Sequence, residues 1–245
     1  MRLLITRPEP DARELKDALA AQGHDVIIEP LLRIELLPIT PDALENLQAM
    51  LVTSRNGVRA LAASAAVAAA RDLPIFCVGE GTAEVARESG FQRVSAGAGT
   101  ARDLVPLVSA KADLAGGALL HVAGEHLAFD LAAALAAQGF DARTLTAYRT
   151  LAAPSLSART AQALGEGRID AVVLMSPRTA AIFAQLVADA GLIDRAQKLR
   201  YICLSERVAE ALGDLAPGRR EIAAAPNSQG MLAAIARVAT QPTGV

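Results

Sequence analysis

Apolar residues along the chain fall into short runs that alternate with segments of helical periodicity. The runs LLIT (3–6), AMLV (49–52), ALLHV (118–122) and AVVL (171–174) have the length and continuity of strands buried on both faces. The segment LKDALAAQG (15–23) places apolar residues three or four positions apart and ends at a glycine, as an amphipathic helix does. Strands that alternate with helices in this way indicate the α/β class with parallel sheets.

This strand–helix–strand pattern is present twice. Residues 15–25 (LKDALAAQGHD) and 131–141 (LAAALAAQGFD) match at eight of eleven positions, and each lies between an apolar run and a β-prone stretch. Two further pairs of segments match in the same order, namely 49–61 with 171–183 and 75–85 with 201–211. Self-similarity of this kind predicts an internal duplication.

The duplication by itself leaves two domain arrangements open. In chain order the segments are A1 (1–37), B1 (41–110), A2 (117–153) and B2 (158–238). One A and one B segment supply enough strands for one small doubly wound domain. A sequential chain pairs A1 with B1, whereas an interleaved chain pairs A1 with B2 and B1 with A2. In the interleaved case the β-prone stretches 26–39 and 142–153 connect the domains.

Composition narrows the function classes. The chain has 245 residues and a formal net charge of -2, without the basic stripe that nucleic-acid binders carry, so we expect no nucleic-acid partner. The N-terminal MRLLITRPEP lacks a signal core and no apolar run is long enough to span a membrane, which predicts a cytoplasmic protein. Cys77 and Cys203 fall at equivalent repeat positions without metal-ligand spacing, so we expect buried, reduced thiols and no metal site.

Candidate chemistry lies where strands end and helices begin. Four junctions combine small hydroxyl residues with helix starts: Thr6-Arg7-Pro8, Thr53-Ser54-Arg55-Asn56, Gly79-Glu80-Gly81-Thr82 and Ser176-Pro177-Arg178-Thr179. Such residues cap helices in any fold, but helix N-termini also bind anions, and four in one chain favour a polyanionic ligand. The pair Gly79 and Gly81 lacks the third glycine of a dinucleotide loop, and no P-loop is present, so nucleotide binding is disfavoured.

Taken together, these segments resemble the uroporphyrinogen-III synthase family. The resemblance spans roughly residues 2–238 and is carried, in order, by LLITRPEPDARELKDALAAQGHDV, LLRIELLP, LVTSRNGVRAL, VGEGTAEVARESGF, AYRT, VLMSPRTAAIF, LSERVAEAL and PNSQGMLAAI. It implies two doubly wound parallel-sheet domains with interleaved connectivity, joined by two β connectors, with a cleft between them. The first domain then comprises residues 1–37 and 153–245, and the second comprises residues 38–152.

The resemblance also implies an activity. The family closes hydroxymethylbilane, a linear tetrapyrrole with eight carboxylates, into uroporphyrinogen III, with loss of water and inversion of ring D, and it uses no cofactor or metal. Tyr148 matches the tyrosine of the family's Y-R/Q-T segment and is expected to hydrogen-bond or protonate the departing hydroxyl. The expected substrate-binding residues are Ser54, Thr82, Ser176, Arg7, Arg55, Asn56 and Ser205. The chain departs from a common family pattern at 204–208, where it has Leu-Ser-Glu-Arg-Val and some members have Gly-Pro-x-Thr-like residues.

Other functions fit the same residues. A non-catalytic cytoplasmic module could clamp a tetrapyrrole or small anion between two lobes. A phosphosugar isomerase-like enzyme would use the same anion sites at helix starts. Turnover distinguishes the synthase from the binding module, and the identity of the ligand distinguishes the isomerase. We expect the protein to act as a monomer on a small-molecule substrate.

Overall fold

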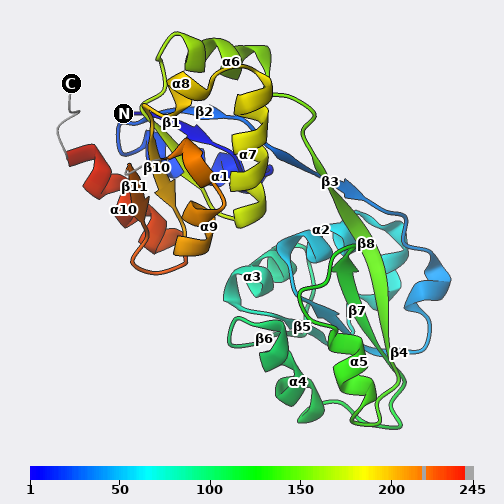
Figure 1. Ribbon diagram of the computed structural model, residues 1–245. Coiled ribbons are helices and arrows are strands. Elements are labelled where there is room, and N and C mark those ends of the chain that lie inside the picture. The colour runs from blue at the N-terminus through cyan, green and yellow to red at the C-terminus, as the bar shows by residue number, and fades with distance from the viewer. Residues whose placement is uncertain (217–218, 241–245) are drawn as a thin grey trace. The chain divides into compact units, whose positions relative to one another are not determined.

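The chain forms two compact units in a computed structural model, which describes residues 1–216 and 219–240 (Figure 1). Unit 1 comprises Met1–Arg33 and Leu151–Val245, and unit 2 comprises Ile34–Thr150. The predicted α/β class with two mostly parallel sheets is confirmed. Residues 217–218 and 241–245, which the predicted first domain includes, lie outside the described residues. No helix in the described ranges is long and apolar enough to cross a membrane.

Unit 1 is built on a five-stranded parallel sheet with the strand order β11-β10-β9-β1-β2. Its strands are β1 (Arg2–Ile5), β2 (Asp25–Ile28), β9 (Ala171–Leu174), β10 (Arg200–Cys203) and β11 (Arg220–Ile222). Its helices are α1 (Asp11–Ala20), α6 (Ala158–Gly165), α7 (Pro177–Asp189), α8 (Ile193–Ala196), α9 (Glu206–Glu210) and α10 (Ser228–Thr240), with a 3-10 turn η3 (Gly213–Leu215). Because successive strand residues face opposite sides, Leu3 and Ile5 pack with α1 and α10, whereas Leu4 packs with α6 and α7.

Unit 2 has a six-stranded sheet with the order β3-β8-β7-β4-β5-β6. Its strands are β3 (Leu32–Leu36), β4 (Leu47–Val52), β5 (Ile75–Cys77), β6 (Val94–Ala96), β7 (Ala118–Gly124) and β8 (Ala142–Ala152). Its helices are α2 (Arg55–Ala63), α3 (Glu80–Glu88), α4 (Ala101–Ser109) and α5 (Leu131–Ala136), with 3-10 turns η1 (Pro41–Leu44) and η2 (Ala65–Ala70). Met50 and Val52 of β4 pack against α2 and α3, and Leu51 packs against α4 and α5.

The two sheets have the same strand order once the repeats are matched. The order β11-β10-β9-β1-β2 of unit 1 corresponds to β6-β5-β4-β7-β8 of unit 2. Segment A1 therefore completes the sheet of B2, and A2 completes the sheet of B1, which confirms the interleaved duplication. Cys77 and Cys203 end the equivalent strands β5 and β10, and both are buried and free. Burial raises the pKa of each thiol to about 12, so both stay protonated at neutral pH.

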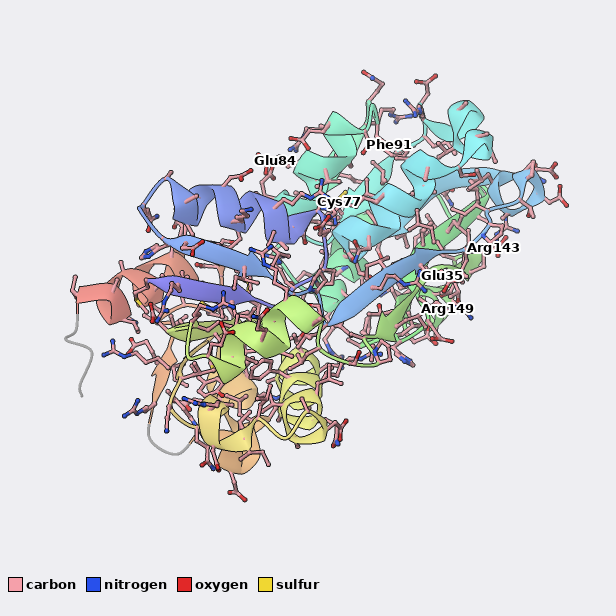
Figure 2. The ribbon with its side chains drawn as sticks, turned by 90° about the horizontal axis from the view of Figure 1, so that it is seen from above. Glu35, Cys77, Glu84, Phe91, Arg143 and Arg149 are labelled. Atoms are coloured by element: carbon pink, nitrogen blue, oxygen red, sulfur yellow. The ribbon has the colours of Figure 1, made fainter. Side chains whose placement is uncertain are left out.

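The chain passes between the units along β3 and β8, which run antiparallel. The N–H of Leu37 donates to the oxygen of Ala147, and the N–H of Ala153 donates to that of Leu31, both over 2.9 Å. Arg149 of β8 also binds Glu35 of β3, with 2.9 Å between Nη2 and Oε1 (Figure 2). The two crossings of the chain are therefore hydrogen-bonded neighbours.

Candidate active site

The predicted site residues all lie at the carboxyl edge of a sheet, where the parallel strands of each unit end. In unit 2 the predicted residues lie on β8 and just after β4 and β5, which follow one another in the sheet with only β7 between β8 and β4. They are Tyr148, Ser54, Arg55, Asn56 and Thr82. Unit 1 brings together, after β1, β9 and β10, the residues Arg7, Ser176 and Ser205. This edge is where ligands bind in open α/β sheets.

Tyr148 lies on β8 beside the end of β7, where its backbone pairs with Gly124 across a register shift. Its ring lies so close to Gly124 that a Cβ built there would be 2.7 Å from Cε2 and Cζ. The side chain is half-buried, and its hydroxyl has no hydrogen-bond partner within residues 1–216 and 219–240. A phenol O–H at the sheet edge is therefore available to a ligand. Sequence reasoning missed Gly124, whose only signal is a glycine that ends a buried strand.

Ser54 and Asn56 are engaged at the start of α2. Ser54 is the N-cap residue, and its Oγ accepts the N–H of Asn56 over 3.1 Å. The Oδ1 of Asn56 accepts a hydrogen bond from Nη1 of Arg59 over 3.0 Å. Both side chains thus serve the helix, as capping predicts. The Ser54 hydroxyl still has its proton to donate, since the cap uses it as an acceptor.

Thr82 lies in the first turn of α3, and Arg55, the first residue of α2, reaches this turn with its side chain. The N-cap residue Gly79 makes no side-chain cap, and the N–H groups of Thr82 and Ala83 both donate to its oxygen. The first-turn N–H groups of Glu80 and Gly81 have no intrahelical acceptor, as at any helix start. The Arg55 guanidinium lies over this turn, because a Cβ built at Gly81 would be 2.9 Å from Nη2. A guanidinium beside a helix N-terminus places positive charge where a carboxylate could bind.

In unit 1 two of the three predicted residues already have side-chain interactions within the protein, and the third makes no cap. Ser176 caps α7 by accepting the N–H of Thr179 over 3.1 Å. Arg7 forms an ion pair with Asp11, with 2.8 Å between Nη2 and Oδ2. Ser205 occupies the N-cap position of α9 but makes no side-chain cap. Val208, at the departure from the family pattern, is buried in the core of unit 1.

A buried histidine that sequence reasoning did not assign to the site supports the start of α2. His121 of β7 is 1% exposed, and its Nε2 lies 3.2 Å from Oγ1 of Thr53, next to Ser54. Burial lowers the pKa of His121 to about 4, so the ring is neutral at neutral pH. Its Nδ1 has no partner in the described part of the chain. The ring therefore orients Thr53 rather than acting as an acid.

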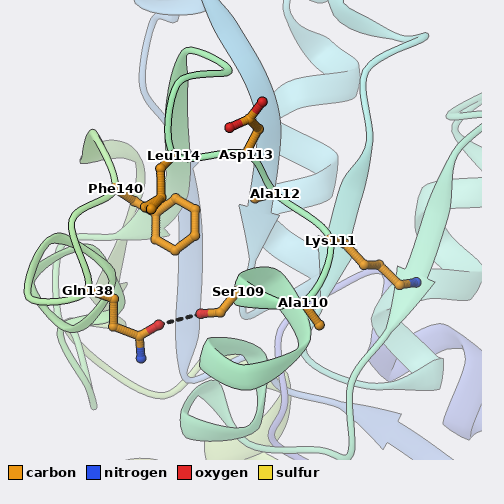
Figure 3. A pocket seen from close by; sticks show the side chains of 8 residues that line it. All are labelled: Ser109, Ala110, Lys111, Ala112, Asp113, Leu114, Gln138 and Phe140. Carbon is orange, nitrogen blue, oxygen red and sulfur yellow. Dashed lines mark hydrogen bonds between the residues drawn. The ribbon is translucent and has the colours of Figure 1, made fainter.

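A pocket of about 590 Å³ lies elsewhere on unit 2 (Figure 3). It is lined by Ser109, Ala110, Lys111, Ala112, Asp113, Leu114, Gln138 and Phe140, and a hydrogen bond joins Ser109 to Gln138. These residues follow the ends of α4 and α5, so the pocket lies at the amino edge of the parallel sheet. None of the predicted site residues lines it.

Comparisons with known proteins agree on one family. A family profile described as "Uroporphyrinogen-III synthase HemD" matches residues 13–233. The chain has 16% identity to uroporphyrinogen-III synthetase from Helicobacter pylori, covering 97% of this chain and all of that one, with a TM-score of 0.63. A mutant uroporphyrinogen III synthase from the extreme thermophile Thermus thermophilus shows 20% identity over 99% of this chain and all of its own, with a TM-score of 0.57. Curated proteins give no sequence match.

Proposed function

The chain belongs to the uroporphyrinogen-III synthase family, and we propose that it is a lyase that closes hydroxymethylbilane into uroporphyrinogen III in porphyrin and heme biosynthesis. The observation that carries this proposal is the family match over residues 13–233, which spans both units. A non-catalytic binding module is not favoured, because the family and the solved structures of the same fold are synthases.

The reaction asks for positioning more than for strong acids or bases. Uncatalysed closure of the linear tetrapyrrole already occurs, so an enzyme gains most by holding one folded conformation of its substrate. Eight carboxylates on the substrate call for several anion sites at the two carboxyl edges. In unit 2 we assign this role to Ser54, Arg55 and Thr82, and in unit 1 to Arg7, Ser176 and Ser205.

Some of these residues already have side-chain partners in the protein, so they differ in what they must give up to bind a carboxylate. Arg7 has to share its guanidinium between Asp11 and a substrate carboxylate, and Asn56 has to exchange its contact with Arg59. Ser205, which makes no cap, donates its hydroxyl without losing a bond in the helix. Thr82 is 7% exposed, so it contributes mainly through its place in the first turn of α3. The start of α3, where the Arg55 guanidinium lies over the first turn, is a further carboxylate position among the predicted residues.

We assign the bond-breaking step to Tyr148. The lone pair of the pyrrole nitrogen pushes out the hydroxyl group of the hydroxymethyl substituent, so the C–O bond breaks and an azafulvene forms. The Tyr148 phenol gives its proton to the departing hydroxyl, which leaves as water. The substituted carbon of ring D attacks this azafulvene, and the resulting spiro intermediate rearranges with ring D inverted. The proton lost on closure restores the phenol. The unengaged hydroxyl beside Gly124 supports this role.

The remaining expectations stay predictions of the sequence. They are a reaction without cofactor or metal, a monomer, a cytoplasmic location, and the absence of a nucleic-acid partner. Each concerns a property that the fold and the family match do not test.

The test is an isomer assay. Freshly prepared hydroxymethylbilane is incubated with the protein, the products are oxidised, and type I and type III porphyrins are separated by chromatography. We expect type III to dominate, because spontaneous closure yields type I. Type I formed at the rate without enzyme, from folded protein, would contradict the proposed function.

A further inference from the structure

Two loops at the carboxyl edge of unit 2 are joined by an arginine stacked on an aromatic ring. Arg102 lies in the first turn of α4, and Phe129 lies in the loop between β7 and α5. The guanidinium carbon of Arg102 is 4.6 Å from the centroid of the Phe129 ring. A guanidinium over a ring face is attracted by the ring's quadrupole, which restricts where the charge of Arg102 can lie.

The N–H groups of this guanidinium have no acceptor in the part of the chain that the structure describes. Arg102 is exposed, and it makes no hydrogen bond or ion pair with any residue in the described ranges. The two neighbouring carboxylates are already used. Asp103 closes the capping box with Thr100 at the start of α4, and Asp130 accepts the N–H of Ala133 at the start of α5. The positive charge of Arg102 is thus oriented but not neutralised.

Arg102 lies at the same carboxyl edge of the unit 2 sheet as the residues assigned to the reaction. The β6–α4 loop that precedes Arg102 meets the start of α3, because a Cβ built at Gly79 would lie 3.4 Å from Cα of Gly99. Phe129 lies five residues after Gly124, and the Tyr148 ring packs against Gly124. The pair therefore joins the start of α4, whose preceding loop contacts the start of α3, to the β7–α5 loop, which begins beside the Tyr148 ring.

We propose that Arg102, held in place by Phe129, binds one of the carboxylates of the linear tetrapyrrole. This inference rests on the proposed function and adds a residue that the sequence did not single out. A guanidinium binds a carboxylate through two parallel N–H donors, and the adjacent first turn of α4 adds its dipole. Phe129 lowers the entropy lost on binding because the side chain is already ordered.

Steady-state kinetics on the full chain test this role. We expect Arg102→Gln to raise KM for hydroxymethylbilane about 10-fold while kcat stays nearly the same, as loss of one charge-assisted hydrogen bond would do. Phe129→Leu keeps an apolar contact but loses the ring face, and we expect KM to rise about threefold. The control is Arg168→Gln, which removes the same charge from an arginine paired with Glu166 just before β9, at the amino edge of unit 1.

The outcomes separate this inference from the proposed function. Type III product from wild-type protein, together with an unchanged KM in folded Arg102→Gln, would overturn the role of Arg102 alone. An equal rise in KM for Arg168→Gln would also overturn it, because overall charge would then explain the effect. If Arg102→Gln does not fold by circular dichroism, Phe129→Leu decides the question. Wild-type protein that yields only type I would overturn the function and this inference with it.

Discussion

At the scale of single residues, the two tyrosines show how surroundings assign a role. Tyr201 is buried in the core of unit 1, and its hydroxyl donates to the oxygen of Ala196 over 3.0 Å. Burial raises the pKa of this phenol well above its usual range. Tyr148 is half-buried, and its hydroxyl is without a partner among the residues described. One phenol therefore has a structural hydrogen bond, while the other keeps its hydroxyl available to a ligand.

This difference makes Tyr148→Phe a specific test. We expect the variant to fold normally and to lose about 10-fold or more in kcat, because a positioned general acid contributes on the order of 10²- to 10⁴-fold. Single-turnover rates on hydroxymethylbilane and thermal unfolding give the two measurements. The matched control is Tyr201→Phe, which should lose about 1 kcal/mol of stability and keep its rate. A full rate in folded Tyr148→Phe would remove this residue from the mechanism.

At the scale of secondary-structure elements, a distant carboxylate completes the start of a helix. Glu29, 6% exposed after β2, accepts the N–H of Ser157 over 2.8 Å and both hydroxyls of Ser157 and Thr160 over 2.5 Å. Ser157 itself caps α6 by accepting the N–H of Thr160. The carboxylate thus joins the end of β2 to the start of α6, one on each side of the inserted unit 2 along the chain.

We expect Glu29→Gln to lower the free energy of unfolding by about 2 kcal/mol, because an amide keeps only one acceptor oxygen for three donors. The change is measured by denaturant titration of the full chain, with unfolding monitored through a signal that reports on unit 1. Glu166→Gln is the control, since Glu166 forms an exposed pair with Arg168, and pairs of that kind add little to stability. Equal stability of the two variants would show that the Glu29 cluster adds nothing.

At the scale of the whole molecule, the interleaved order means that unit 2 is an insertion into unit 1. Each unit has apolar clusters on both faces of its own sheet. The N–H of Ala153 donates to the oxygen of Leu31 over 2.9 Å, so the chain leaves and re-enters unit 1 at neighbouring points. A core for each unit and adjacent ends are the conditions under which an insertion can be removed.

We therefore expect each unit to fold alone. Residues 34–150 expressed by themselves should unfold cooperatively on heating, and so should unit 1 with Arg33 joined to Leu151 through a short glycine-rich turn. Calorimetry and circular dichroism of the two proteins provide the measurement. Neither should form type III porphyrin alone, since each retains only part of the proposed substrate contacts. Two unfolded products would show that the units depend on each other for stability.

Local patterns determined much of this protein. Apolar runs and helical periodicity predicted the strands and helices, because burial and hydrogen bonding of a segment repeat along its own length. The match between 15–25 and 131–141 predicted the duplication, and the structure confirms it in the common strand order. The hydroxyl residues Ser54 and Ser176 were predicted at helix starts because capping is a contact between near neighbours in sequence.

Only the tertiary structure decided which distant segments meet. The periodicity did not distinguish the sequential from the interleaved pairing, because both bury the same apolar faces. The ring of Tyr148 on Gly124, the carboxylate of Glu29 at the start of α6, and Arg102 on Phe129 each join residues far apart in the chain. No local pattern signals such contacts, because their energy depends on neighbours that only the folded sheet and its loops bring together.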